Sequence, residues 1–218
     1  MNNYLDIILS LPKSAYFCFK QMPLRQALRL PVLVSWRTKF KTLSGKIEFS
    51  SADLKFGMVR FGLSGSGTAI FMPVVIENEG CMEFGKGVRF GGGCQISIGK
   101  EARLRVGDNT NFTGECHILA SRSITLGEHC LISWNTHIMD IDIHKIYTDN
   151  KLTNADSPIC IGNDIWICNH VIIGKGVKIP DNVVIAAGSL ITKPIMENNI
   201  VCTGMPLKVL KRNIRWEE

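Results

Sequence analysis

Between Ile161 and Met196 the hydrophobic positions return every six residues. Isoleucine fills the first place of six successive hexads, at Ile161, Ile167, Ile173, Ile179, Ile185 and Ile191. A second aliphatic position, four places further along, holds Ile165, Val171, Val177, Val183 and Ile195. A strict period of this kind identifies a structural repeat rather than a series of unrelated strands.

Each hexad combines a short strand with a corner. The fifth residue of one hexad and the first of the next are two apart, so in an extended segment both side chains point to one face. The third and fourth places hold residues that turn the chain or accept positive φ, such as Asp181-Asn182 and Ala187-Gly188. Three such sides would make a coil of 18 residues, which would stack Ile161 over Ile179 and bury an aliphatic column.

The hexads IGNDIW, ICNHVI and IGKGVK resemble those of the hexapeptide-repeat acyltransferases, and most closely the bacterial polysaccharide and sugar O-acetyltransferases. The resemblance covers about residues 84–212 and is strongest after Leu126. It implies an all-β fold, the left-handed parallel β-helix. The handedness comes from the resemblance alone, because parallel crossovers are generally right-handed. The resemblance also implies a homotrimer with each active site between two β-helices.

Before Ile124 the hexad repeat is irregular, and after Ile124 it is interrupted once. We therefore expect an N-terminal cap over residues 1–45, a β-helix over 46–204 and a C-terminal tail over 205–218. Within the β-helix, residues 139–158 have no hexad phase, which predicts a protruding loop. A long polar excursion from a rigid scaffold is where substrate-handling residues are expected.

The first fifth of the chain is strongly basic. The chain carries a formal charge of +6, and residues 1–46 contain eight Lys or Arg against Asp6 alone, a net +7. Pro12, Pro23 and Pro31 divide this segment, which predicts two or three short helices. Such a segment could cap the open first coil, as any solenoid requires. It could also contact an anionic membrane or a lipid-linked substrate through its cationic and aromatic residues.

The remaining composition indicates a cytoplasmic protein. No apolar run is long enough to cross a bilayer, and the first residues lack the basic region of a secretory signal. The eight cysteines form no CxxC pair. Cys94, Cys116 and Cys130 occupy fifth places of their hexads, which is typical of small core or corner residues in a reducing compartment. We expect no nucleic-acid partner, and a location in the cytoplasm, at most at the inner face of the membrane.

The excursion contains two acids and an imidazole, in the order Asp140, Asp142 and His144. Acyl transfer from a thioester to a hydroxyl requires a base with a pKa near neutrality, and histidine is the usual choice. His144 is therefore the predicted base, and Asp142 or Asp140 could fix its tautomer. Spacing leaves the choice of carboxylate open, and a solvated loop histidine is the alternative. The resemblance agrees, since its members carry the catalytic histidine in a loop at this point.

The last coils offer a groove for coenzyme A. Backbone groups at the corner Ala187-Gly188 can bond the amides of a pantetheine arm, because small residues permit close approach. Lys193, Lys208 and Lys211 can meet the phosphates. Alternatively, these lysines belong to a solvated surface and tail.

The resemblance adds residue roles to this groove. Asn169 follows a segment similar to the family's WIG motif, which lines the donor groove. Ala187, Thr192 and Lys193 match positions that contact coenzyme A. Trp166, or else a backbone N–H, is expected to stabilise the oxyanion. The alternative for Trp166 is a packing residue.

The remaining histidines suggest one rival chemistry. His117 and His137 are twenty residues apart, nearly one coil, and could stack on one face. With His144 they could form a zinc site like that of the γ-class carbonic anhydrases. The close histidine pair of that family is missing, so we expect no metal. A solenoid that only binds or assembles is a further alternative.

The sequence thus predicts an acetyl-CoA-dependent O-acetyltransferase. Its acceptor would be a sugar hydroxyl of a bacterial surface polysaccharide or of its precursor, an expectation that rests on the resemblance and the basic cap. An N-acetyltransferase acting on a sugar nucleotide is the nearest alternative within the class.

Overall fold

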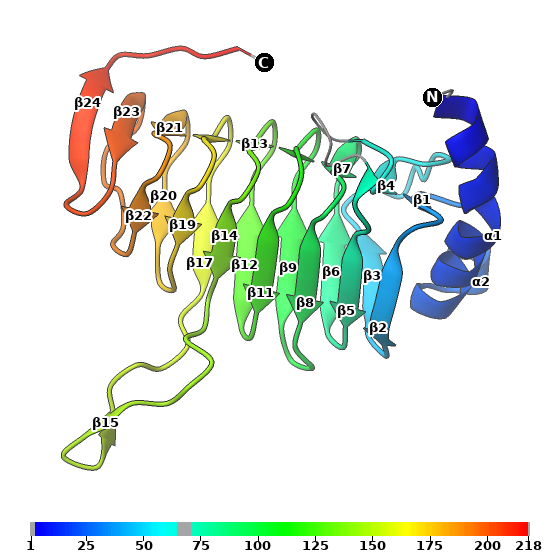
Figure 1. Cartoon of the computed structure of the whole chain (residues 1–218), viewed down its shortest axis with the longest axis horizontal. Coiled ribbons are helices and arrows are strands. Elements are labelled where there is room, and N and C mark those ends of the chain that lie inside the picture. The colour runs from blue at the N-terminus through cyan, green and yellow to red at the C-terminus, as the bar shows by residue number, and fades with distance from the viewer. Residues whose placement is uncertain (1–2, 65–70, 218) are drawn as a thin grey trace.

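The computed structural model describes residues 3–64 and 71–217. Its strands wind around a single column, and two helices stand at the end where the chain begins (Figure 1). These helices are α1 (Asn3–Gln21) and α2 (Leu24–Ala27). From there the coils follow one another along the axis to β24 at the opposite end (Figure 1).

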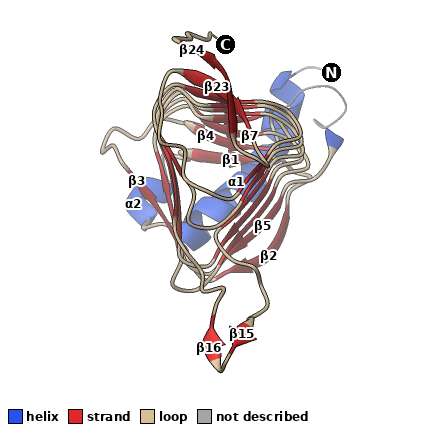
Figure 2. Ribbon diagram, turned by 90° about the vertical axis from the view of Figure 1, so that its left-hand side faces the viewer, coloured by secondary structure: helices blue, strands red, loops and turns tan. Residues whose placement is uncertain are grey.

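Three sheets form the three sides of the column (Figure 2). The first side contains β1 (Val32–Val34), β4 (Val59–Phe61), β7 (Val88–Phe90), β10 (Asn111–Phe112), β13 (Leu131–Ile132), β18 (Trp166–Ile167), β21 (Val183–Ile185), β23 (Ile200–Thr203) and β24 (Lys208–Arg212). The second side contains β2 (Lys39–Leu43), β5 (Val75–Asn78), β8 (Gln95–Ile98), β11 (His117–Ala120), β14 (His137–Met139), β19 (Ile172–Ile173) and β22 (Leu190–Ile191). The third side contains β3 (Lys46–Phe49), β6 (Cys81–Phe84), β9 (Arg103–Val106), β12 (Ser123–Leu126), β17 (Ile159–Ile161) and β20 (Lys178–Ile179).

The register of the last coils follows the hexad spacing. Ile161 pairs with Ile179 across parallel strands β17 and β20, and Ile167 pairs with Ile185 across β18 and β21. All six first-place isoleucines are at most 3% exposed. The stacked aliphatic column and the three-sided parallel β-helix predicted from the sequence are therefore confirmed.

Larger residues fill the column where the repeat is worn. Phe61, Phe90 and Phe112 occupy the same position in successive coils of the first side and are fully buried. Their rings stack with centroid separations of 4.6 and 4.5 Å. Aromatic stacking thus replaces the isoleucine ladder in these coils, which is why the aliphatic period fades in the sequence.

The amino-terminal segment differs from the prediction of short helices. α1 is a single helix of 19 residues, and Pro12 lies inside it. Proline removes one hydrogen bond, to the carbonyl of Ile8, and the prediction treated that loss as a break. Pro12 is on the exposed side, where water can satisfy this carbonyl. The β-helix also starts earlier than residue 46, because β1 and β2 already form the first coil.

α1 covers the open end of the first coil. The Cys18 thiol donates to the carbonyl of Val32 at 3.3 Å, and the Val34 N–H donates to Ser14 Oγ at 2.9 Å. Phe17 is fully buried against the first coils, with its ring 5.2 Å from that of Phe40. The helix therefore acts as the cap that a solenoid requires.

Two features complete the chain. Residues 140–158 leave the column between β14 and β17 and carry a small hairpin, β15 (Tyr147–Thr148) and β16 (Lys151–Leu152), far out from the coils (Figure 1). After residue 204, β24 pairs antiparallel with β23, so the expected tail begins as a strand. Across residues 3–64 and 71–217, no helix combines the length and hydropathy of a membrane span.

Candidate active site

The excursion at residues 140–158 is anchored at its root by Asp140. This carboxylate is fully buried and accepts hydrogen bonds from the backbone N–H groups of Ser121, Arg122 and Ser123 at 2.6, 2.8 and 2.7 Å. Its two oxygens fix the corner of the preceding coil. Asp140 therefore does not orient His144, and that part of the prediction is wrong.

Asp142 ties the excursion to the following coil. Its Oδ2 accepts hydrogen bonds from Lys175 Nζ and, at 3.0 Å, from Asn154 Nδ2. Lys175 Nζ also donates to the Asn154 carbonyl at 2.7 Å. The hydrogen bond from Lys175, followed by that from Asn154, lowers the pKa of Asp142. The carboxylate is thus held ionised as a structural anchor for the loop.

His144 stands on this anchored loop with its ring exposed. Asn154 fixes the backbone around it: Nδ2 donates to the His144 carbonyl at 2.7 Å, and Oδ1 accepts from the Ile146 N–H at 2.6 Å. Among the residues that the structure describes, neither ring nitrogen of His144 has a hydrogen-bond partner. The predicted Asp142 contact is therefore not formed within one chain, because Lys175 and Asn154 occupy that carboxylate.

A cavity of about 260 Å³ lies beside the root of the loop, on the outer face of the second side. Ile143, the neighbour of His144, supplies part of its wall. Two polar residues of the lining are paired, since Ser97 Oγ donates to Glu77 Oε2 at 2.8 Å. The remaining polar lining residues are Lys41, Gln95 and His117. The cavity can therefore offer hydrogen bonds to a hydroxyl-rich molecule, although most of its wall is apolar.

His117 and His137 stack as their spacing predicted. They pair across β11 and β14, and their rings are parallel within 1°, with centroids 4.5 Å apart. Burial, and then the neighbouring His137, lowers the pKa of His117. Within residues 3–64 and 71–217, no three His, Cys, Asp or Glu side chains form a group that could hold a metal ion. His144 is thus not joined to the pair, and the geometry offers no support for the zinc alternative.

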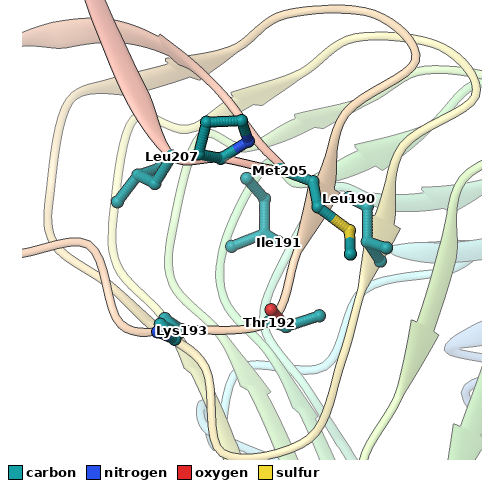
Figure 3. A pocket seen from close by; sticks show the side chains of 7 residues that line it. Leu190, Ile191, Thr192, Lys193, Met205 and Leu207 are labelled. Atoms are coloured by element: carbon teal, nitrogen blue, oxygen red, sulfur yellow. The ribbon is translucent and has the colours of Figure 1, made fainter.

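A second pocket, of about 380 Å³, lies at the last coil (Figure 3). Thr192 and Lys193, both predicted donor-binding residues, lie along one edge, and Met205 and Leu207 project from the segment opposite (Figure 3). Leu190, Ile191 and Pro206 complete a mostly apolar lining. Lys208 follows this segment directly in the chain and is exposed. The pocket therefore combines apolar walls with cationic groups at its rim.

The other predicted donor residues lie elsewhere. Asn169, Ala187 and Gly188 are stacked at the corner between the first and second sides, where the Gly188 N–H donates to the Asn169 carbonyl at 3.0 Å. Thr192 begins the corner between the second and third sides. Lys211 is exposed on β24 of the first side. The predicted set is thus divided between two corners, with the width of the second side between them.

Trp166 also lies away from the excursion. It belongs to β18 on the first side, and its Nε1 is 3.3 Å from Ser133 Oγ, to which it donates. Its ring centroid is 6.0 Å from that of Trp216, whose Nε1 donates to the Asp164 carbonyl at 2.8 Å. The excursion leaves from the corner between the other two sides. Within one chain, Trp166 and His144 therefore do not meet.

Three residues of this arrangement were missed by the sequence reasoning. Lys175 lies in an ordinary Gly-Lys-Gly corner, and Asn154 lies in a featureless polar stretch. Trp216 stands in a charged tail without hexad spacing. Of these three residues, only Trp216 could have been singled out from the sequence, because it is an isolated aromatic residue at the end of a polar segment. The partner of Lys175, Asp142, is 33 residues away in the sequence, and no pattern around Asn154 indicates its contacts within the excursion.

Comparisons with known proteins place this geometry among characterised relatives. No protein-family model matches the chain. The chain is 30% identical to the polysialic acid O-acetyltransferase of Neisseria meningitidis over 71% of its length and 67% of that protein. It is 35% identical to the galactoside O-acetyltransferase of Escherichia coli (strain K12), where the match spans 57% of either chain. The chain thus covers little more than half of that relative.

A solved structure shares the fold. The polySia-specific acetyltransferase NeuO superposes with a TM-score of 0.61, over 86% of this chain and 79% of that one, at 20% identity. At this identity the likeness concerns the fold alone. It agrees with the left-handed parallel β-helix that the family resemblance implies.

Proposed function

Because the chain belongs to the hexapeptide-repeat O-acetyltransferases, we propose that it transfers an acetyl group from acetyl-CoA to a sugar hydroxyl. One observation carries the proposal. The only long excursion among the described residues presents a free imidazole, that of His144, on a backbone fixed by Asp142, Lys175 and Asn154. A base held in place beside a cavity that can bind a hydroxyl compound is what deprotonation of the hydroxyl requires.

The proposed reaction is a direct transfer. His144 takes the proton of the acceptor hydroxyl as its oxygen attacks the thioester carbonyl, and the resulting oxyanion accepts a hydrogen bond from the Trp166 indole or a backbone N–H. When the tetrahedral intermediate collapses, the C–S bond breaks and the imidazolium returns the proton to the departing thiolate. The products are the O-acetyl sugar and free coenzyme A.

The division of the predicted residues supports an assembly in which two copies share each site. Trp166 and Asn169 lie on or beside the first side, whereas His144 projects from the opposite corner. A second copy that turns its first side toward this corner would bring the indole to the imidazole. Closed rings of such head-to-tail contacts are cyclic, and we propose the homotrimer.

The pocket at the last coil suits the donor. Its apolar walls can cover a pantetheine arm, and Lys193 of the lining, with Lys208 directly after Leu207 in the chain, can pair with phosphates. The corner at Ala187 and Gly188 has open space above it, since no atom lies within 4 Å of a Cβ placed on Gly188. An extended cofactor could therefore pass along this backbone as well.

The cavity beside Ile143 suits a glycan acceptor, because its lining combines apolar side chains with hydrogen-bonding groups. Glu77, Ser97 and His117 present carboxylate, hydroxyl and imidazole groups along one wall. The relatives are named for a galactoside and for polysialic acid, which are both carbohydrates. We propose a bacterial surface polysaccharide or its precursor as the acceptor. Such precursors and acetyl-CoA meet in the cytoplasm, at the inner face of the membrane.

The test is thiol release from acetyl-CoA in the presence of a panel of glycans and sugar nucleotides. His144→Ala should lower turnover by roughly two to four orders of magnitude and leave the Kd for acetyl-CoA unchanged, because the imidazole moves a proton but does not hold the donor. His129→Ala is the matched control, since His129 is an exposed corner histidine on another edge of the column. Full activity of the His144 variant would refute the mechanism.

A further inference from the structure

The inward face of α1 is unusually polar for a helix that covers a hydrophobic column. Ser10, Ser14 and Gln21 are buried there. Ser14 Oγ accepts from the Val34 N–H at 2.9 Å, and Gln21 Nε2 donates to the Leu43 carbonyl at 3.0 Å. The inward face of α1 is thus fixed to the first coil by hydrogen bonds as well as by the burial of Phe17 and Cys18.

The outward face of α1 is apolar. Six large side chains recur there at helical spacing and are about half exposed or more: Tyr4 (81%), Leu5 (56%), Ile8 (60%), Leu9 (50%), Tyr16 (57%) and Phe19 (49%). We call these residues the outer stripe. A helix on the surface of a soluble protein normally carries polar residues in this position. α1 therefore presents a second apolar face on the side away from the first coil, and the outer stripe needs a partner of its own.

Basic residues flank the outer stripe. Leu24 and Leu28 continue the exposed apolar surface at 64% and 67%, and each is followed directly by an arginine, Arg25 or Arg29. Neither arginine forms an ion pair with any residue that the structure describes. The single acid of residues 1–46, Asp6, is 3.4 Å from the Arg37 guanidinium. The surface is thus apolar with an uncompensated positive rim.

The helices are positioned so that a flat partner surface can reach the outer stripe. α1 and α2 stand beyond the first coil, at the extreme end of the column (Figure 1). The sheets and the excursion lie behind them or to the side (Figure 1). A flat surface can therefore meet the outer stripe without touching the coils.

We propose that the outer stripe, with Leu24 and Leu28, lies in the interface of an anionic lipid bilayer. Apolar and aromatic side chains would enter the boundary between headgroups and acyl chains, and Arg25 and Arg29 would pair with lipid phosphates. An anionic bilayer matches both the apolar stripe and the positive rim, whereas a second copy of this basic segment would bring like charges together. Lipid binding needs no acyl transfer, so its test is independent of the proposed reaction.

The test uses the full chain in co-sedimentation with vesicles. Wild-type protein should bind vesicles of phosphatidylethanolamine containing about a third phosphatidylglycerol, and release as salt is raised. Leu5→Gln with Ile8→Gln, or Arg25→Glu with Arg29→Glu, should each lower the partition coefficient by roughly tenfold or more. Met196→Gln, which alters a side chain 90% exposed near the other end of the column, should bind as wild type.

Three results would overturn the proposal. One is a wild-type protein that stays in the supernatant with anionic vesicles at low salt. Another is equal binding to pure phosphatidylcholine, which would remove the role of charge. The third is a Leu5→Gln, Ile8→Gln variant that keeps its lipid binding but shows a smaller assembly by light scattering, which would assign the outer stripe to a second copy. Unchanged circular dichroism of the variants separates each result from misfolding.

Discussion

Asp140 and Asp142 are two residues apart in the sequence, and each is committed to holding the chain. Asp140 is buried against three backbone N–H groups of the preceding coil, whereas Asp142 faces Lys175 of the following coil. Together they attach the excursion to both of its neighbours. His144, two residues further on, is left with a free imidazole on a fixed backbone.

Lys175→Met should release the excursion without touching the reacting atoms. We expect turnover to fall roughly ten- to hundredfold, because a displaced base loses its alignment with the hydroxyl, while the Kd for acetyl-CoA stays unchanged. Limited proteolysis should cut within residues 140–158 faster than in the wild type. Lys178→Met, on the neighbouring exposed strand position of β20, is the matched control. Wild-type turnover together with faster proteolysis would show that the anchor is not needed for catalysis.

The same anchor should respond to acid. The pKa of Asp142 is lower in the folded protein than in the unfolded chain, so its contribution is fully present above the ordinary aspartate range. It is lost as the pH falls below about 4, through the lowered pKa of the folded state. Near neutral pH the contribution of this anchor to stability is therefore constant.

The His117–His137 stack should make the fold sensitive to mild acid. The pKa of His117 is lowered in the folded state, so the unfolded chain binds more protons once the pH falls below about 6.5, and stability decreases. When the pH is lowered from about 7.5 to about 5.5, the Tm of the His117→Gln variant should therefore fall less than the Tm of the wild type. Glutamine fits this column, because Gln95 already occupies the position one coil earlier. Thermal unfolding with His129→Gln as control checks the prediction, and an equal loss of Tm in both variants would contradict it.

At the scale of single residues, the sequence predicts which side chains are buried in the core. It does not predict the contact between Asp142 and Lys175 that anchors the excursion. Every first-place isoleucine is buried because the hexad itself sets which side chains point inward. The partner of Asp142 is 33 residues away in the sequence and that of Trp166 is 50 residues away, each brought close only by the stacking of coils or the return of the tail. No local pattern carries that information.

In strand β19, only one of the two residues packs in the core. It contains Ile172, which is 39% exposed, and Ile173, which is fully buried. We expect Ile173→Ala to lower the free energy of unfolding by about 2–5 kcal/mol, since it leaves a cavity in the column. Ile172→Ala should cost less than about 1 kcal/mol. Denaturant unfolding at one protein concentration compares these adjacent residues, and similar costs would mean that the hexad does not define the core.

The elements before residue 46 were the least predictable. Proline statistics favour a break at Pro12, yet contacts with the first coil hold α1 together through it. β1 and β2 carry no aliphatic hexad, and their pairing with β4 and β5 depends on loops that cover many residues. Tertiary packing overrides local preference in both cases.

The whole molecule keeps its candidate groups on different edges of a rigid prism. This separation predicts complementation between two defective chains. Neither His144→Ala nor Trp166→Phe should have appreciable activity alone, but each mixed trimer contains one intact site of three, so isolated mixed trimers should recover up to about one third of the wild-type sites. Activity is measured after co-expression with two affinity tags, which isolates the mixed assemblies. Mixed assemblies without recovered activity would place the whole site within one chain.

Because the coils are evenly spaced, the number of coils between two points of the column sets the distance between them. From β2 in the first coil to β14, where the excursion leaves, there are four strand spacings on the second side, or about 19 Å at ~4.8 Å each. The thickness of α1 adds roughly 10 Å. If α1 lies on a bilayer, the root of the excursion that carries His144 stands at a set height of about 30 Å above the lipid. A membrane-anchored glycan would then be modified only on sugars that reach this height, and short chains would escape acetylation.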